Sequence, residues 1–221
     1  MGINIAVYAE KFNGNEWFAE PTQLYVEELF DHQTGESWLE PQAIYYDRND
    51  QLSEILGMRQ PFNDLTQIVS QARGFPEDIS GELIDHFART WLQDWWKEPQ
   101  DWLLLRQQAR NLNFDQTWFL LSELLSFDWY GQQQQHYGEV KAEDASRFGD
   151  GQQHFPADLT GGVWKNQSFR PTGQPQPGYA QVSWIETYAE KVGSRFMNQV
   201  LPLLQTYGTP NNVRIVLWLE V

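Results

Sequence analysis

The sequence predicts an α+β domain, with helices packed on a small, largely antiparallel sheet that contains the N-terminal hairpin and the C-terminal strand. Three observations support this fold class. Apolar and polar residues alternate at the N-terminus, apolar residues recur at helical spacing in the middle, and residues 213–221 are apolar on one face and at the centre of the other. A strand with apolar residues on both faces needs cover on both, so we expect the C-terminal strand inside the sheet rather than at its edge.

The N-terminal part predicts two hairpins. Alternation over residues 3–10 is typical of a strand with one buried face. The following pair, Asn13-Gly14, tolerates the positive φ angles of a type I′ turn and predicts a returning strand at residues 16–19. A Thr-Gly step at residues 34–35 suggests the second hairpin.

Two helices are expected in the next part of the chain. Asn49 or Asp50 can cap a short helix that ends at Gly57. Ser80 can cap a longer helix that ends before Pro99. The longer helix carries an aromatic stripe at helical spacing, which is typical of a face that packs on the core.

The remaining chain predicts an irregular region between two helices. Gly, Pro and Gln dominate residues 131–178, so we expect a long insertion or loop region there, within a single domain that spans residues 1–221. A short helix at residues 122–127 precedes this region. Ser183 and Glu186 form a capping-box pattern, which predicts that a second helix begins there and leads toward the final strand.

Composition limits the classes of ligand and location. Nucleic acid backbones and anionic membranes attract basic surfaces, so a net charge of −15 predicts direct binding to neither. An acidic face can meet a basic protein surface, although the charge also fits a role in solubility alone. The chain has no cysteine and its four histidines lack metal-ligand spacing, so we expect no metal and no cofactor. Without a long apolar run or a signal segment, a soluble cytoplasmic protein is expected.

Three arginines are candidates for an anion site because cations are scarce in this chain. They are Arg48, Arg59 and Arg73. Guanidinium groups bind carboxylate or phosphate in a bidentate manner, so three that converge would hold an anionic ligand. The alternative is that each arginine pairs with one of the many carboxylates and fixes a loop.

Carboxylates and a tryptophan supply the other candidates. Asp78, Glu123 and Asp128 could include a general acid and base, or could serve as helix caps and loop contacts. Trp96 follows another tryptophan, and adjacent helical residues point about 100° apart, so only one of the two can face the core. Trp96 is therefore the candidate for a partner surface, unless residues 131–178 cover it.

Several segments, in the same order, resemble a loosely defined family of uncharacterised bacterial and phage proteins. The matching segments are Met1–Glu10, Arg48–Ser53, Arg59, Arg73–Ser80, Thr117–Trp129 and the terminal strand. No activity is assigned to this family, so the resemblance supplies positions rather than a reaction. Those positions, as candidate ligand-binding residues, are Arg48, Asn49, Arg59, Arg73, Asp78, Glu123 and Asp128.

The departures from the family pattern concern its polar residues. Family members open Met-Gly-Cys/Leu-Asp-Ile-His, which places two metal-capable side chains on one face of the first strand. Asn4 and Ala6 occupy these positions here, and Asn113–Asp115 replace a histidine that usually precedes the Ser-Trp segment. The resemblance therefore implies that this chain has lost any metal site of that kind.

The leading hypothesis is a non-catalytic binding or interaction protein of phage or mobile-element origin, which offers an acidic, tryptophan-bearing surface to a protein partner. An alternative is a small-anion-binding or hydrolase-like domain centred on Arg48, Arg73, Glu123 and Asp128. A third hypothesis is a carbohydrate-binding module that uses exposed tryptophans. A flat acidic patch around Trp96 would favour the first hypothesis. Arginines and carboxylates that line one cleft would favour the second, and coplanar exposed indoles would favour the third.

Overall fold

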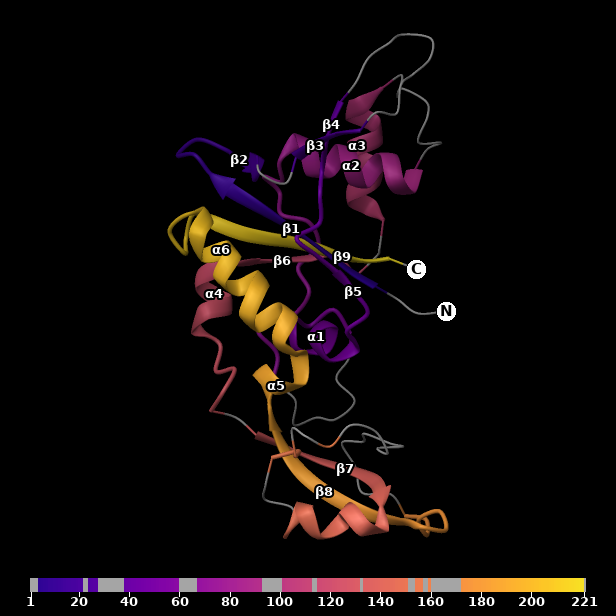
Figure 1. The fold of residues 1–221 in the computed structure, drawn as a ribbon. Coiled ribbons are helices and arrows are strands. Elements are labelled where there is room, and N and C mark those ends of the chain that lie inside the picture. Colours follow the sequence, from indigo (N-terminus) through magenta and orange to yellow (C-terminus); the bar gives the residue numbers. More distant parts are fainter. Residues whose placement is uncertain are drawn as a thin grey trace. The chain divides into compact units, whose positions relative to one another are not determined.

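The chain forms two compact units in the computed structural model (Figure 1). The structure describes residues 4–21, 24–27, 38–59, 67–92, 101–112, 115–131, 133–150, 154–156, 159 and 172–220. Unit 1 comprises Met1–Gln60, Ile68–Phe127 and Arg195–Val221, and unit 2 comprises Pro61–Gln67 and Asp128–Ser194. The expectation of one domain over residues 1–221 stays a prediction.

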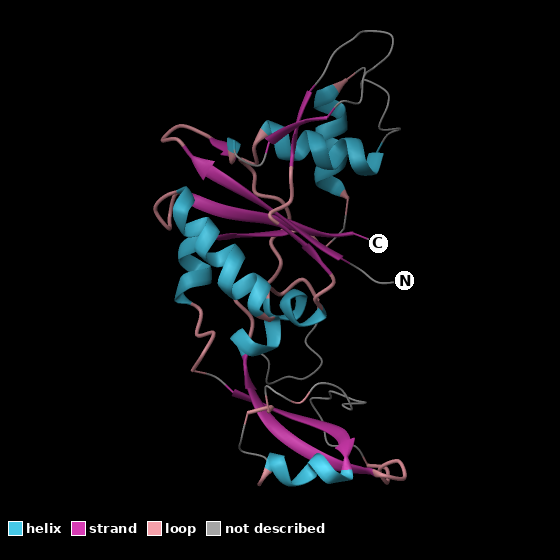
Figure 2. Ribbon diagram, in the orientation of Figure 1, coloured by secondary structure: helices cyan, strands magenta, loops and turns pink. Residues whose placement is uncertain are grey.

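A mostly antiparallel sheet forms the centre of unit 1 and confirms the predicted α+β class (Figure 2). Its strand order is β2-β1-β9-β6, and β5 also pairs with β1. The strands are β1 (Asn4–Phe12), β2 (Trp17–Ala19), β5 (Tyr45–Asp47), β6 (Thr117–Leu120) and β9 (Val213–Glu220). The C-terminal strand β9 lies between β1 and β6 and is buried from Val213 to Leu219, as its sequence predicts.

Helices cover both faces of this sheet, which explains why β9 is apolar on both (Figure 1). On one face, Val216 and Trp218 pack against the buried residues Leu83 and Phe87 of α2 (Gly81–Leu92), next to α3 (Trp102–Asn111). On the other side lie α1 (Asp50–Ile55), α4 (Leu121–Ser126) and α6 (Leu201–Tyr207), which follows a π-helical turn, η3 (Phe196–Val200). Pro202 occupies the first turn of α6, directly after this π-helical turn.

The predicted helix caps of unit 1 are present. The backbone N–H of Leu52 donates to Oδ1 of Asn49 at 2.9 Å, at the start of α1. The N–H of Leu83 donates to Oγ of Ser80 at 3.4 Å, and that of Ile84 donates to the Ser80 carbonyl at 3.2 Å. These contacts satisfy N–H groups that have no partner within the helix, so they fix where each helix begins.

The first hairpin is confirmed, but the prediction of a type I′ turn is wrong. Phe12 pairs with Trp17, which leaves a loop of four residues. A type I′ turn needs positive φ at both central residues, whereas of the pair Asn13-Gly14 only Gly14 has it, at 103°. Asn13 instead accepts the N–H groups of Asn15 and Glu16 on Oδ1, at 2.9 and 3.1 Å, which closes a wider turn.

A second hairpin pairs β3 (Leu24–Glu27) with β4 (Trp38–Pro41). The pairing agrees with the hairpin suggested for this segment. The Thr-Gly step that suggested it, at residues 34–35, lies outside the described residues.

Unit 2 contains a hairpin where irregular structure and a helix start are expected. Strand β7 (Gln133–Lys141) pairs along its length with β8 (Tyr179–Thr187), and a 3₁₀ helix, η2 (Ala142–Phe148), follows β7. The helix predicted from Ser183 is wrong, because Ser183 lies within β8. Helix α5 (Tyr188–Val192) begins later, where Thr187 and Glu190 form the capping box. Burial explains the difference. As part of strand β8, Trp184 packs with Val140 and Phe148 in a small hydrophobic core.

Candidate functional site

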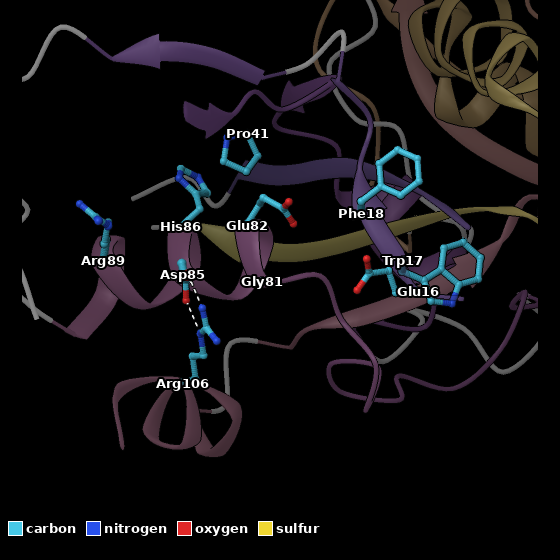
Figure 3. A pocket seen from close by; sticks show the side chains of 10 residues that line it. All are labelled: Glu16, Trp17, Phe18, Pro41, Gly81, Glu82, Asp85, His86, Arg89 and Arg106. Atoms are coloured by element: carbon cyan, nitrogen blue, oxygen red, sulfur yellow. Dashed lines mark hydrogen bonds and ion pairs between the residues drawn. The ribbon is translucent and has the colours of Figure 1, made fainter. Parts of the chain in front are cut away.

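Unit 1 contains a pocket of about 420 Å³, within the volume range of small-molecule sites (Figure 3). Four elements line it. The β2 side contributes Glu16, Trp17 and Phe18, the end of β4 contributes Pro41, α2 contributes Gly81, Glu82, Asp85, His86 and Arg89, and α3 contributes Arg106.

Helix α2 supplies an ordered row of charged and polar side chains. Its core face is fixed by buried Leu83 and Phe87. Glu82, His86 and Arg89 are spaced four and three residues apart, so they share the opposite face of the helix. Figure 3 shows these three side chains pointing to the same side of α2. The amphipathic pattern that builds the core therefore also builds one wall of the pocket.

An ion pair closes the pocket between α2 and α3. Nε of Arg106 donates to Oδ1 of Asp85 at 2.5 Å, and Nη2 donates to Oδ2 at 2.7 Å. The hydrogen bonds that Arg106 donates to Asp85 raise the pKa of Arg106 above its ordinary value, so this guanidinium stays charged. Both Arg106 and Arg89 lie over the Trp102 ring, 6.0 and 4.8 Å from its centroid. Asp85 and Arg106 thus neutralise each other at the wall of the pocket.

His86 connects the pocket to the core of the sheet. Its Nε2 lies 3.0 Å from the Tyr8 hydroxyl. The Tyr8 ring stacks on Trp218 with centroids 4.4 Å apart and an angle of 16° between the planes. Because Tyr8 and Trp218 are buried, these contacts hold the His86 ring at the back of the pocket.

A buried ion pair fixes the β2 wall relative to α2. Arg214 and Glu10 have side chains that are 2% and 0% exposed, and Nε of Arg214 donates to Oε2 of Glu10 at 2.5 Å. Oε1 of Glu10 accepts the N–H of Ser80 at 2.7 Å, at the start of α2. The Arg214 guanidinium also lies 4.1 Å from the centroid of Trp17. The Glu10 carboxylate therefore links β1 to β9 and to the start of α2. Its partner Arg214 packs on Trp17, which lines the pocket.

Sequence reasoning missed Glu10 and Arg214, although a signal was present. Both are charged residues on strands that are otherwise strongly apolar, and a charge in such a strand is retained only with a partner. The register places Glu10 directly opposite Arg214.

The structure brings two of the predicted site residues together. Nη1 and Nη2 of Arg73 donate to Oε2 and Oε1 of Glu123 at 3.1 and 2.5 Å. The guanidinium also lies 4.9 Å from the Trp118 centroid. Partial burial raises the pKa of Glu123, but hydrogen bonds from Arg73 and from the Leu120 N–H, with the charge of Arg73, outweigh it and leave this pKa below its ordinary value.

The other predicted site residues make contacts with residues outside the predicted set. Asp78 accepts from Nη1 of Arg214 at 2.6 Å. Arg59 pairs with Asp50 of α1 at 2.8 Å. The remaining candidates are Asn49, which caps α1, Arg48, which follows β5, and Asp128, which lies in unit 2 and accepts the Gly131 N–H.

None of the predicted anion-site residues lines the pocket. Trp96 lies outside the described residues. Arg73 and Glu123 therefore pair with each other, while Arg59, Asp78 and Asp128 contact residues that are not among the candidates.

The described part of the chain shows neither of two further classes of site. It contains no group of three or more histidine, aspartate or glutamate side chains that could hold a metal ion. None of its helices combines the length and the apolar character that a membrane crossing requires.

Comparison with known proteins gives no match to a family model, to a curated protein or to a solved structure. The geometry of the pocket is therefore the basis for inferring function.

Proposed function

We propose that this protein is a non-catalytic binding protein, and that its acidic, tryptophan-bearing surface receives a basic segment of a protein partner at the pocket of unit 1. One observation carries the proposal. The exposed carboxylates of Glu16 and Glu82, which come from different elements, line one pocket together with Trp17. Within the part of the chain that the structure describes, neither carboxylate forms an ion pair.

The charge balance of the pocket supports a cationic group as ligand. Arg106 forms its ion pair with Asp85 and only a longer-range charge interaction with Glu82, so Glu16 and Glu82 are the lining carboxylates that a cationic ligand would pair with. A guanidinium or ammonium group gains both from a carboxylate and from an aromatic face. A whole-chain charge of −15 would attract a basic partner over a longer range and raise its association rate.

The protein itself repeatedly combines arginine with a carboxylate and an aromatic ring. Arg214 lies on Trp17 and pairs with Glu10, and Arg195 lies on Tyr45 and pairs with Asp47. Arg73 and Arg106 likewise each pair with a carboxylate and lie near a tryptophan ring. A partner's arginine that entered beside Glu16 and Phe18 would find similar chemistry.

A small-ligand site is the second candidate, because arginines and carboxylates do line one cleft. These residues differ from the predicted set of Arg48, Arg73, Glu123 and Asp128, none of which lines this pocket. The carbohydrate hypothesis has less support, since the guanidinium of Arg214 lies over Trp17 and that of Arg89 lies over Trp102.

Location and origin belong to the same proposal. A cytoplasmic protein that binds neither nucleic acid nor membrane directly agrees with the acidic composition. The phage or mobile-element origin follows from the resemblance of the sequence segments alone.

Selection from a random peptide library displayed on phage tests the proposal. With the purified protein as bait, we expect selected peptides to be enriched in arginine or lysine, and Glu16→Gln combined with Glu82→Gln to abolish the enrichment. Glu143→Gln is the matched control, because this exposed carboxylate lies in unit 2. Enrichment that survives the double substitution, or no enrichment in the wild-type protein, would overturn the proposal.

A further inference from the structure

We infer that Asp85 is a third recognition carboxylate of the pocket, that it takes a guanidinium group, and that Arg106 is its internal competitor. This inference rests on the proposed function and specifies the basic group of the partner as arginine rather than lysine. In the free protein, Arg106 occupies the position that the guanidinium of a partner takes when it binds. Binding then releases the Arg106 side chain from Asp85.

Arg106 shows that a guanidinium group fits at the wall of the pocket. It lines the pocket from α3, and Asp85 lines it from α2 (Figure 3). Two hydrogen bonds, at 2.5 and 2.7 Å, join the guanidinium to both oxygens of the carboxylate. The negative charge of Glu82 also acts on Arg106, and the Trp102 ring centroid lies 6.0 Å from the guanidinium. The surroundings of Arg106 are therefore those that the arginine of a partner requires.

The ion pair is accessible to a ligand. The side chains of Arg106 and Asp85 are 37% and 25% exposed. Ion pairs that water reaches contribute little net stability, because water solvates both charges when they separate. Gly81 of α2 has no side chain to place beside the guanidinium, and a Cβ atom there would lie 3.7 Å from Nη2 of Arg106. One guanidinium can therefore replace another at Asp85 at little cost.

The geometry of this exchange favours arginine over lysine. A planar guanidinium donates two parallel N–H groups to one carboxylate, whereas an ammonium group acts as a point charge. When an arginine replaces Arg106, Asp85 keeps both of its hydrogen bonds. A lysine cannot reproduce this bidentate pair, so it gains only the carboxylates of Glu16 and Glu82.

NMR titration of the full chain with two matched peptides tests the inference. The peptides are acetyl-Gly-Ser-Arg-Ser-Gly-amide and its counterpart with lysine in place of arginine. In Arg106→Gln the internal competitor is removed, so we expect the ratio of arginine-peptide to lysine-peptide affinity to rise at least about threefold above that of wild type. Adding Asp85→Asn to Arg106→Gln should abolish this rise. An unchanged ratio in Arg106→Gln would overturn the inference.

Arg110→Gln is the matched control for a general effect of charge. Arg110 also lies on α3, but it donates to the Pro76 carbonyl at 3.0 Å and does not line the pocket. Loss of its charge strengthens the binding of both peptides to a similar extent and leaves their ratio unchanged. An equal rise of the ratio in Arg110→Gln and Arg106→Gln would show that charge alone is responsible.

The release of Arg106 can also be measured in the wild-type protein, so the test does not depend on whether Arg106→Gln folds. At equal saturation, the Nε–H signal of Arg106 should shift or broaden more with the arginine peptide than with the lysine peptide. An equal response to the two peptides, or no response to either, would contradict the competition for Asp85.

The outcomes separate this inference from the proposed function. Binding of both peptides that depends on Glu16 and Glu82, with an unchanged ratio in Arg106→Gln, would retain the binding function and reject the internal competitor. Absence of binding of either peptide to wild type and to Arg106→Gln would reject both.

Discussion

Arg214 is the residue whose contacts hold the pocket wall together. It is almost fully buried, and it pairs with buried Glu10 and with Asp78. Its guanidinium lies 4.1 Å from the Trp17 centroid and 5.7 Å from the Trp118 centroid. Removing one member of a buried pair leaves an uncompensated charge in a medium of low dielectric constant. Removing one member of such a buried network therefore lowers the free energy of unfolding far more than removing one member of an exposed pair.

We predict that Arg214→Met lowers the free energy of unfolding by about 3–5 kcal/mol, the range for breaking a buried pair. Urea denaturation measures this change. Arg195→Met is the control, because Arg195 and Asp47 are both 50% exposed, and such pairs contribute about 0–1 kcal/mol. Similar small losses in the two variants would contradict the structural role of Arg214.

Glu123 gives a pH dependence of stability with a defined sign. Its pKa in the folded protein lies below the ordinary value of 4.5, so its pairing with Arg73 stabilises the protein above that value. The stabilisation is lost as the pH falls through the lower pKa of the folded state. At neutral pH we expect Glu123→Gln to reduce the free energy of unfolding by about 1 kcal/mol, because the pair is partly exposed.

The measurement is the difference in unfolding free energy between wild type and Glu123→Gln at pH 7 and at pH 3.5. We expect the difference to shrink toward zero at the lower pH. A difference that stays constant, or that grows as the pH falls, would show that the ion pair is not its source.

At the scale of elements, the sequence predicts those whose pattern reports burial directly. Strand β9, the first hairpin and the start of α2 follow from alternation, a turn signal and a cap. Strand β8 does not, because Ser183 and Glu186 match a local capping pattern while burial of Trp184 in a small core favours a strand. In such a segment, tertiary packing decides the secondary structure and overrides the local preference for a helix start.

Most of the pocket is beyond prediction from the sequence, for a similar reason. Glu16, Glu82 and Arg106 belong to segments that are far apart in the chain, and spacing within a segment does not show which segments meet. The sequence marks Arg73 and Glu123 as candidates, but their pairing depends on tertiary contacts that bring the segment before α2 to β6 and α4.

The cap of α5 gives a prediction at the element scale. Oγ1 of Thr187 accepts the N–H of Glu190 at 3.2 Å, so Thr187→Ala should cost about 1 kcal/mol of stability, the usual value for an N-cap. Ser183→Ala should cost less than about 0.5 kcal/mol, because Ser183 lies within β8 and caps no helix. Chemical denaturation followed by circular dichroism compares the variants. A larger loss in Ser183→Ala would restore the helix start predicted from the sequence.

At the scale of the whole molecule, the charge and the architecture are the basis of the proposed recognition of a basic partner. The chain carries fifteen more acidic than basic groups, counted with neutral histidine, and the pocket of unit 1 gathers carboxylates, arginines and aromatic side chains from four separate elements. The buried pair of Arg214 and Glu10 stabilises the arrangement that keeps these elements together. In the proposed function, the long-range charge would attract a partner, and the pocket would select the segment that enters.

The most direct measurement of this account is a two-dimensional ¹H–¹⁵N NMR titration of the full chain with a synthetic arginine-containing peptide. We predict that the shifted amides cluster at residues 16–18 and 81–89, and that Glu82→Gln removes the shifts while Glu143→Gln keeps them. Shifts centred in unit 2, or shifts at the pocket that Glu82→Gln leaves unchanged, would contradict the claim that this pocket recognises a basic group.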